Sequence, residues 1–284
     1  MSIPHISEAR RLADDTVAVG GVFPAVLTTL INLVDSVKAL PPAPDPTALL
    51  IDDALAGKSV DLSKLITTAA KAETEAEYAK RLHTMVERDA MRRFQVELSN
   101  SGGQLILDSI TPAFDETAAA IAAATAVVDI SWTPDQLVST GTPEQLAAWQ
   151  KLPALVARVD KFAALAAGFG RHGTFALIET PGHLVHNEIV GLRDEALLLT
   201  DSDPWRASDL VHARRADWRT SPWVRMPLRL NTIDEAKERL RVLCEAAFDA
   251  IELSRGVQGR MTDDGWRQDP RRPNPFALPE AAQA

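Results

Sequence analysis

The chain has few residues that suggest reaction chemistry. It holds a single cysteine, Cys244, among 284 residues, which excludes an intramolecular disulfide framework. Cys244 lies within a helical pattern, and we interpret it as a small buried hydrophobe. The sequence has no Gly-x-Ser-x-Gly elbow and no phosphate-cradling glycine loop with a lysine. It therefore predicts no cofactor, and an enzyme only if dispersed residues assemble a site in space.

Membrane-spanning character is also weak. The uncharged stretch 16–34 approaches the minimum spanning length, but two glycines and a proline interrupt it. Asp14 and Asp15 precede it, where a signal peptide would carry positive charge. We therefore expect buried helices and no membrane partner. We also expect a protein of the cytoplasm, or of a particle assembled there.

Helical periodicity is what the sequence has in abundance, and it predicts a mainly α fold with a multi-helix body. Two N-terminal helices within 1–40, broken near Gly20-Gly21, are followed by a Pro-rich linker at 41–46. A helical body is expected over 47–173.

Within this body, two helical stretches cover 61–99 and 114–128, separated by a glycine-containing turn at 100–103. The alanine run of the second stretch permits close helix–helix approach. We expect these two stretches to form a long antiparallel helical hairpin.

Capping chemistry marks three further helix starts. Thr133 and Thr142 are each followed by proline and, three residues on, by glutamine. The helix after Thr142 is expected to reach Gly168, either straight or kinked at Pro153. Thr232 and a glutamate three residues later predict the last helix. Its expected core face consists of Ile233, Leu240, Leu243, Ala247 and Ile251.

A mixed section is expected over 174–256. Apolar residues from Val185 to Leu199 fit one helical face, and Asp203-Pro204 starts another helix. From Trp223 to Leu230 apolar residues alternate, as in an edge strand or a lone extended segment. The tail over 257–284 is rich in proline, arginine and aspartate, and little independent structure is expected there.

Two motifs have a simpler structural interpretation. Gly168 to Gly173 matches the letters of a dinucleotide fingerprint, but a helix precedes it where a strand is needed, so we interpret it as a helix-ending loop. His183 and His186 share a helical face and, with Glu179 or Glu188, offer metal ligands. No spacing fixes a third ligand, so we assign no metal-binding residue.

The aspartates of the Asp201-Ser202-Asp203 stretch offer ligands for a hard cation. We interpret the loop instead as carrying the cap of the following helix.

The segment 204–229 concentrates tryptophan and arginine. It contains six arginines and two aspartates, which gives the segment a local charge of +4 in a chain whose net charge is −9. Three interpretations remain open: internal bridging, a protein interface, and nucleic-acid contact through phosphates and stacking. The candidate partner-binding residues are Trp205, Arg206, Arg214, Arg215, Trp218, Arg219, Trp223 and Arg225, with Arg229 nearby.

The tail adds two aromatic candidates, Trp266 and Phe276, among several prolines. Aromatic anchors on a Pro-rich segment suit docking into a groove. The alternative is that the tail folds back on its own chain.

The leading hypothesis from the sequence is a non-enzymatic structural or assembly protein, for example a viral particle component or assembly factor. It would act through helical surfaces and a docking tail, with protein partners or self-association. The first alternative is a helical nucleic-acid-binding or regulatory protein using segment 204–229, which the negative net charge disfavours. The second is a metal-dependent enzyme around His183 and His186.

Overall fold

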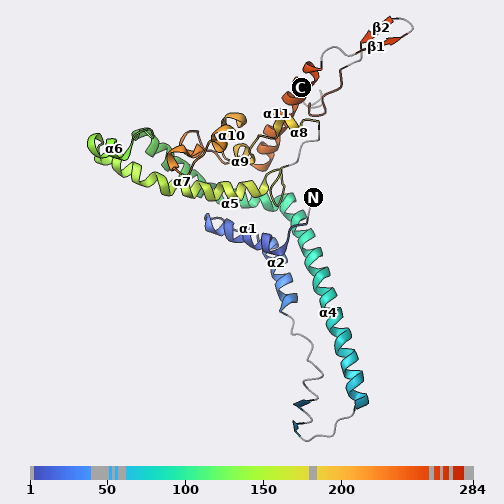
Figure 1. Cartoon of the computed structure of the whole chain (residues 1–284). Coiled ribbons are helices and arrows are strands. Elements are labelled where there is room, and N and C mark those ends of the chain that lie inside the picture. The colour runs from blue at the N-terminus through green and yellow to red at the C-terminus, as the bar shows by residue number, and fades with distance from the viewer. Residues whose placement is uncertain are drawn as a thin grey trace. The chain divides into compact units, whose positions relative to one another are not determined.

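A computed structural model describes residues 3–39, 51–52, 55–56, 62–178, 184–255, 259–262, 265–268 and 271–277. The fold is mainly α, as the sequence predicts (Figure 1). The α-helices are α1 (Ile6–Ala18), α2 (Ala25–Lys38), α4 (Leu62–Glu97), α5 (Gly103–Val127), α6 (Pro134–Thr140), α7 (Pro143–Phe169), α8 (His186–Ile189), α9 (Asp194–Leu198), α10 (Pro204–His212) and α11 (Ile233–Ser254).

Contacts divide the chain into two compact units. The first comprises residues 1–14 and 23–102, and the second comprises residues 15–22 and 103–284. The Pro-rich stretch 41–46, predicted to be a linker, lies outside the described residues.

In the first unit, α2 packs against α4. Leu27, Ile31 and Val34 form the buried face of α2, and the rings of Phe23 and Phe94 stack with centroids 6.4 Å apart. The predicted break between α1 and α2 is confirmed.

The prediction of a turn at 100–103 that separates two helices is wrong. Leu98–Gly102 forms a π-helical turn, so the backbone stays helical between α4 and α5. A Cβ on Gly102 would lie 3.1 Å from Cδ1 of Leu27, so the missing side chain lets this turn approach α2 closely.

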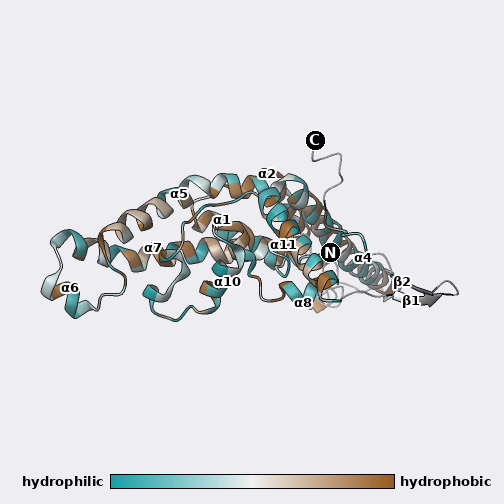
Figure 2. Cartoon of the chain, turned by 90° about the horizontal axis from the view of Figure 1, so that it is seen from above, coloured by the Kyte–Doolittle hydropathy of each residue, from teal (hydrophilic) through white to brown (hydrophobic). Residues whose placement is uncertain are grey.

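A long antiparallel helical hairpin is present in the second unit, but its arms are α5 and α7 (Figures 1 and 2). The rings of Phe114 and Phe162 meet edge to face at 5.3 Å, and Arg158 pairs with Glu116 at 3.7 Å. The prediction that 61–99 pairs with 114–128 is therefore wrong. The apolar stripe of α5 was identified, but its partner helix was not.

The predicted helix starts at Thr133 and Thr142 are confirmed. Each threonine accepts a hydrogen bond from the backbone N–H of the glutamine three residues on, and that glutamine's side chain accepts one from the threonine N–H. Helix α7 continues past Pro153 to Phe169 as one element. The connection between the hairpin arms is thus organised as a separately capped short helix, α6.

The section after α7 is irregular, as expected, but the single helical face predicted over 185–199 is wrong. Its residues form two short helices, α8 and α9, with a turn between them. The buried guanidinium of Arg171 donates to the carbonyl oxygens of Ile189 at 3.4 Å and Leu192 at 2.7 Å. These bonds connect the turn between α8 and α9 to the loop that follows α7.

The predicted extended run from Trp223 to Leu230 is wrong at its start. Residues Pro222–Val224 form a 3-10 turn, preceded by another at Trp218–Thr220. From Pro227 the chain has no strand partner among the described residues, but the backbone N–H of Arg229 donates to the Leu199 carbonyl at 3.0 Å. The alternation reflects an irregular segment that bonds to the end of α9.

Helix α11 begins with the predicted capping box at Thr232. Its expected core face is only partly right, since Leu243, Ala247 and Ile251 are half-buried. The fully buried positions are Ile233, Ala236, Leu240, Cys244 and Phe248.

The tail contains a two-stranded antiparallel hairpin, β1 (Gly259–Thr262) and β2 (Gly265–Gln268). The prediction of little independent structure in the tail is therefore wrong for the residues of these two strands. Across the part of the chain that the structure describes, no helix combines the length and apolar character needed to cross a membrane.

Candidate interaction surfaces

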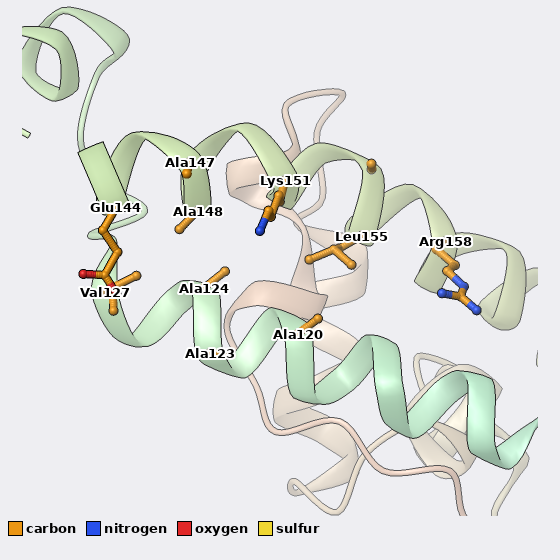
Figure 3. Close-up of a pocket in the computed structure, with 11 residues that line it drawn as sticks. Ala120, Ala123, Ala124, Val127, Glu144, Ala147, Ala148, Lys151, Leu155 and Arg158 are labelled. Carbon is orange, nitrogen blue, oxygen red and sulfur yellow. The ribbon is translucent and has the colours of Figure 1, made fainter. Parts of the chain in front are cut away.

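The α5–α7 hairpin carries an exposed groove between its two helices (Figure 3). The groove has a volume of about 660 Å³. Its α5 side consists of Ala120, Ala123, Ala124 and Val127. Its α7 side consists of Glu144, Ala147, Ala148, Lys151, Ala154, Leu155 and Arg158. We call this set the alanine groove.

The groove exists because its walls are short side chains. Figure 3 shows alanine methyl groups of both helices directed toward the space between them. Ala123, Ala147 and Ala154 are exposed in this chain, although alanine is apolar. In Figure 2 the half of α5 that leads to α6 is pale and brown, the colours of its alanines and valine. An apolar partner side chain would therefore find space and apolar contact here.

The charged residues that line the groove all come from α7, and one of them, Arg158, also pairs with Glu116 of α5 just outside the lining. Glu144, Lys151 and Arg158 line the groove from α7 at intervals of seven residues, two helical turns each. Residues 117–128 of the facing helix carry no charge. The rim therefore has an acidic end near α6 and a basic end near the middle of α7.

The sequence signal for this site is incomplete. The alanine run of α5 predicted close helix approach, but not that part of it would stay exposed. The matching small residues on α7 were not recognised as a second wall.

Segment 204–229 is bonded largely to its own chain. The carboxylate of Asp160 on α7 accepts two hydrogen bonds from Arg214, both of 2.5 Å, and one of 2.7 Å from the indole N–H of Trp223. Trp223 is 2% exposed. The indole of Trp223 therefore lies in the core of the chain.

An aromatic cluster lies beside this carboxylate. The rings of Trp149 and Trp218 meet edge to face at 4.8 Å, and the guanidinium of Arg219 lies 5.9 Å from the Trp149 ring centre. Arg219 also pairs with Asp217, and this hydrogen bond lowers the pKa of Asp217. Arg219 and Trp218 thus connect the segment to α7.

The remaining arginines are bonded in several ways. Arg225 donates to the carbonyl of Arg219, and Arg215 donates to backbone carbonyls of its own turn. Arg229 pairs with Asp201 and Glu235. The carboxylates that offset the positive segment thus come mostly from outside it.

Trp205 is half-buried on α10, and Arg206 is exposed. The contacts of segment 204–229 agree with the first of the three interpretations, in which its arginines and tryptophans bridge parts of their own chain. Partner contact by the exposed residues Arg206, Arg215 and Arg225 stays a prediction.

The histidine region shows no assembled metal centre in the ranges that the structure covers. His183 and Glu179 lie outside the described residues, so their predicted pairing with His186 stays a hypothesis. The His186 ring lies 6.5 Å from that of His172. Asp203 caps α10, as predicted, by accepting from the backbone N–H of Arg206 at 2.8 Å.

The glycine-rich loop is confirmed as a helix end, and it carries a buried ion pair that the sequence did not indicate. Nε of Arg171 lies 2.7 Å from the carboxylate of Asp194, and the two side chains are 2% and 10% exposed. A Cβ on Gly170 would overlap Asp194. Glycine is needed here because this carboxylate packs directly against the loop.

Cys244 is buried, as predicted, and burial raises the pKa of its thiol. We expect thiol labelling of the native protein at neutral pH to be at least about 100-fold slower than labelling in denaturant, because only exposed thiolate reacts quickly. Timed labelling with a maleimide, followed by mass spectrometry, measures this ratio. Equal rates in both conditions would contradict the buried placement.

The two tail aromatics have different environments. Trp266 lies on β2 and is 53% exposed. Phe276 is half-buried, and its ring lies 6.4 Å from that of Phe248 on α11. The described segment 271–277 thus folds back on its own chain, whereas Trp266 stays accessible.

Comparison with protein families, curated proteins and solved structures found no match to this chain.

Proposed function

We propose that the protein is a non-enzymatic structural or assembly component that self-associates through the alanine groove. The observation that carries this proposal is the exposed groove of about 660 Å³ between α5 and α7. Viral particles are built from repeated contacts between identical chains, and a particle component or assembly factor is the class we propose.

The shape of the groove suits a helix. From Glu144 to Arg158 the wall formed by α7 spans 14 helical steps, about 21 Å at 1.5 Å per residue. Alanine walls allow helix axes to approach to about 8 Å, the lower end of the usual range. A helix from another chain would therefore bury apolar surface here without rearranging α5 or α7.

Rim charges favour a second copy as the occupant. In a two-fold arrangement with its axis near Lys151, Glu144 of one chain faces Arg158 of the other, and the reverse pair forms at the same time. The two Lys151 side chains would meet near the axis. This contact costs a few tenths of a kcal/mol, because lysine is long and the position is exposed.

The proposal predicts a dimer whose rim charges can be exchanged. Light scattering over a range of concentrations is expected to give the mass of two chains. The variants Glu144→Arg and Arg158→Glu should each weaken the dimer, because like charges then face each other. A 1:1 mixture of the two should restore it, since each heterodimer contains two opposite-charge pairs.

Circular dichroism of each single variant provides the control for folding. A wild-type chain that stays monomeric at all concentrations would overturn the proposal. So would a mixture that associates no better than its components.

A further inference from the structure

A small cavity lies where α9 packs against α7 and α10 (Figure 1). Its volume is about 230 Å³, which is below the range of about 300–1,000 Å³ that pockets for drug-sized ligands occupy. An occupant of this cavity must therefore be a smaller molecule. The cavity shares no lining residue with the alanine groove, so the two sites can be tested separately.

Four polar side chains from different parts of the chain line this cavity. His172 follows α7, Arg193 precedes α9, Glu195 belongs to α9, and His212 ends α10. Apolar side chains, among them the buried Leu192, form the rest of the wall. A few polar groups that converge on a partly apolar cavity are typical of a small-molecule site.

Hydrogen bonds within the chain hold the walls of the cavity in place. Nε2 of His212 donates to the backbone carbonyl of Gly191 at 3.0 Å, which fixes the orientation of this imidazole. The backbone N–H of Arg193 donates to the hydroxyl of Ser208 on α10 at 2.9 Å. The cavity is therefore preformed, and binding would require little rearrangement of the chain.

Two opposite charges line the cavity without pairing. Among the described residues, neither the guanidinium of Arg193 nor the carboxylate of Glu195 has an ion-pair partner. They are two positions apart, a spacing at which side chains of a helix do not face each other. Asp194 also lines the cavity, but Arg171 balances its charge at 2.7 Å. A ligand would therefore meet one available guanidinium and one available carboxylate.

We propose that this cavity binds a small zwitterion, a molecule with the ammonium and carboxylate groups of a free amino acid. Arg193 would bind the carboxylate, because a guanidinium can donate two parallel hydrogen bonds to it. Glu195 would bind the ammonium group, and the two histidines would add hydrogen bonds. A ligand with a single charge would leave one of the two charged side chains without a partner. The inference does not depend on self-association through the alanine groove.

NMR titration of the full-length protein tests this site. L-alanine and β-alanine are the zwitterionic probes, and acetate and ethylammonium each carry only one of the two charges. At least one zwitterion should shift the backbone amide signals of 172–173 and 190–195 saturably, with a dissociation constant on the order of 1 mM. The single-charge probes should bind at least about tenfold more weakly, because each makes only one of the two charged contacts.

Substitutions of the two charged side chains make the test specific. Arg193→Gln and Glu195→Gln should each weaken binding of the zwitterion at least about tenfold. Arg206→Gln and Glu188→Gln are the matched controls, because these residues are exposed and lie outside the cavity. Both controls should leave the dissociation constant unchanged.

Three results would overturn the inference. The first is the absence of localised shifts with either zwitterion at about 10 mM, ten times the expected dissociation constant. The second is binding of acetate or ethylammonium as tight as that of the zwitterions. The third is unchanged binding in Arg193→Gln and Glu195→Gln. None of these results depends on whether the groove dimer forms.

Discussion

Replacing Ala154 by glutamate is expected to raise the dimer dissociation constant at least about 100-fold, or about 3 kcal/mol. Ala154 is exposed and lines the alanine groove, so the substitution disturbs no core contact of the single chain. In a two-fold dimer it places two carboxylates in the apolar face. Desolvating a carboxylate costs several kcal/mol, and pairing with Lys151 or Arg158 of the same helix offsets only part of this cost. Analytical ultracentrifugation over a dilution series measures the constant.

Ala164→Glu is the matched control. Ala164 is also an exposed alanine of α7, but it lies outside the groove. It should therefore leave the dissociation constant unchanged, while both variants keep wild-type thermal unfolding. Equal weakening by the two substitutions would mean a general charge effect. An unchanged constant for Ala154→Glu would exclude the groove as the interface.

Breaking the Arg171–Asp194 pair should have the largest effect on stability. We expect Arg171→Met to lower the free energy of unfolding by about 3–5 kcal/mol, because it leaves a buried carboxylate without its counter-charge. It also removes the donors to the carbonyls of Ile189 and Leu192. Urea unfolding followed by circular dichroism measures this loss, provided that the transition is two-state.

Two comparisons make this result specific. Asp194→Asn keeps the shape and one acceptor, so it should cost less than Arg171→Met. Arg93→Ala removes a more exposed pair with Glu97, away from the alanine groove, which is expected to contribute only about 0–1 kcal/mol. A loss below 1 kcal/mol for Arg171→Met would show that the buried pair contributes little to stability.

Helix starts were predictable because their determinants are local. Thr133, Thr142 and Thr232 each cap a helix with a side chain three residues away, and the structure has all three capping boxes. The burial of Cys244 was expected from its residue type, because a free cysteine within a helix usually behaves as a small buried hydrophobe. Such features need only a few neighbouring residues, so their sequence signal is complete.

Partner choice between elements was not predictable in the same way. The pairing of α5 with α7 instead of α4 depends on contacts between residues about 40 positions apart. Segment 204–229 shows the same limit for charge. Counted along the sequence it is strongly positive, but Asp160, Asp201 and Glu235 lie beside its arginines in space. A local charge count therefore overstated what the segment offers to a partner.

The alanine groove was only partly predictable from the sequence. The alanine run of α5 was visible in the sequence, and it predicted a place where another helix can approach closely. Alanine is compatible with both a buried and an exposed position, so composition alone did not separate the two. The exposure of Ala123, Ala147 and Ala154 became apparent only with the relative placement of the two helices.

The open space beside Ala147 and Ala154 has an evolutionary consequence. Leucine, glutamine or lysine at these positions would continue the helix nearly as well and would meet little resistance from the rest of the chain. Folding alone therefore exerts no pressure to keep them small. If the groove receives a partner, binding and not folding is the constraint that keeps these two positions small, and related chains that lost the partner would be free to fill them.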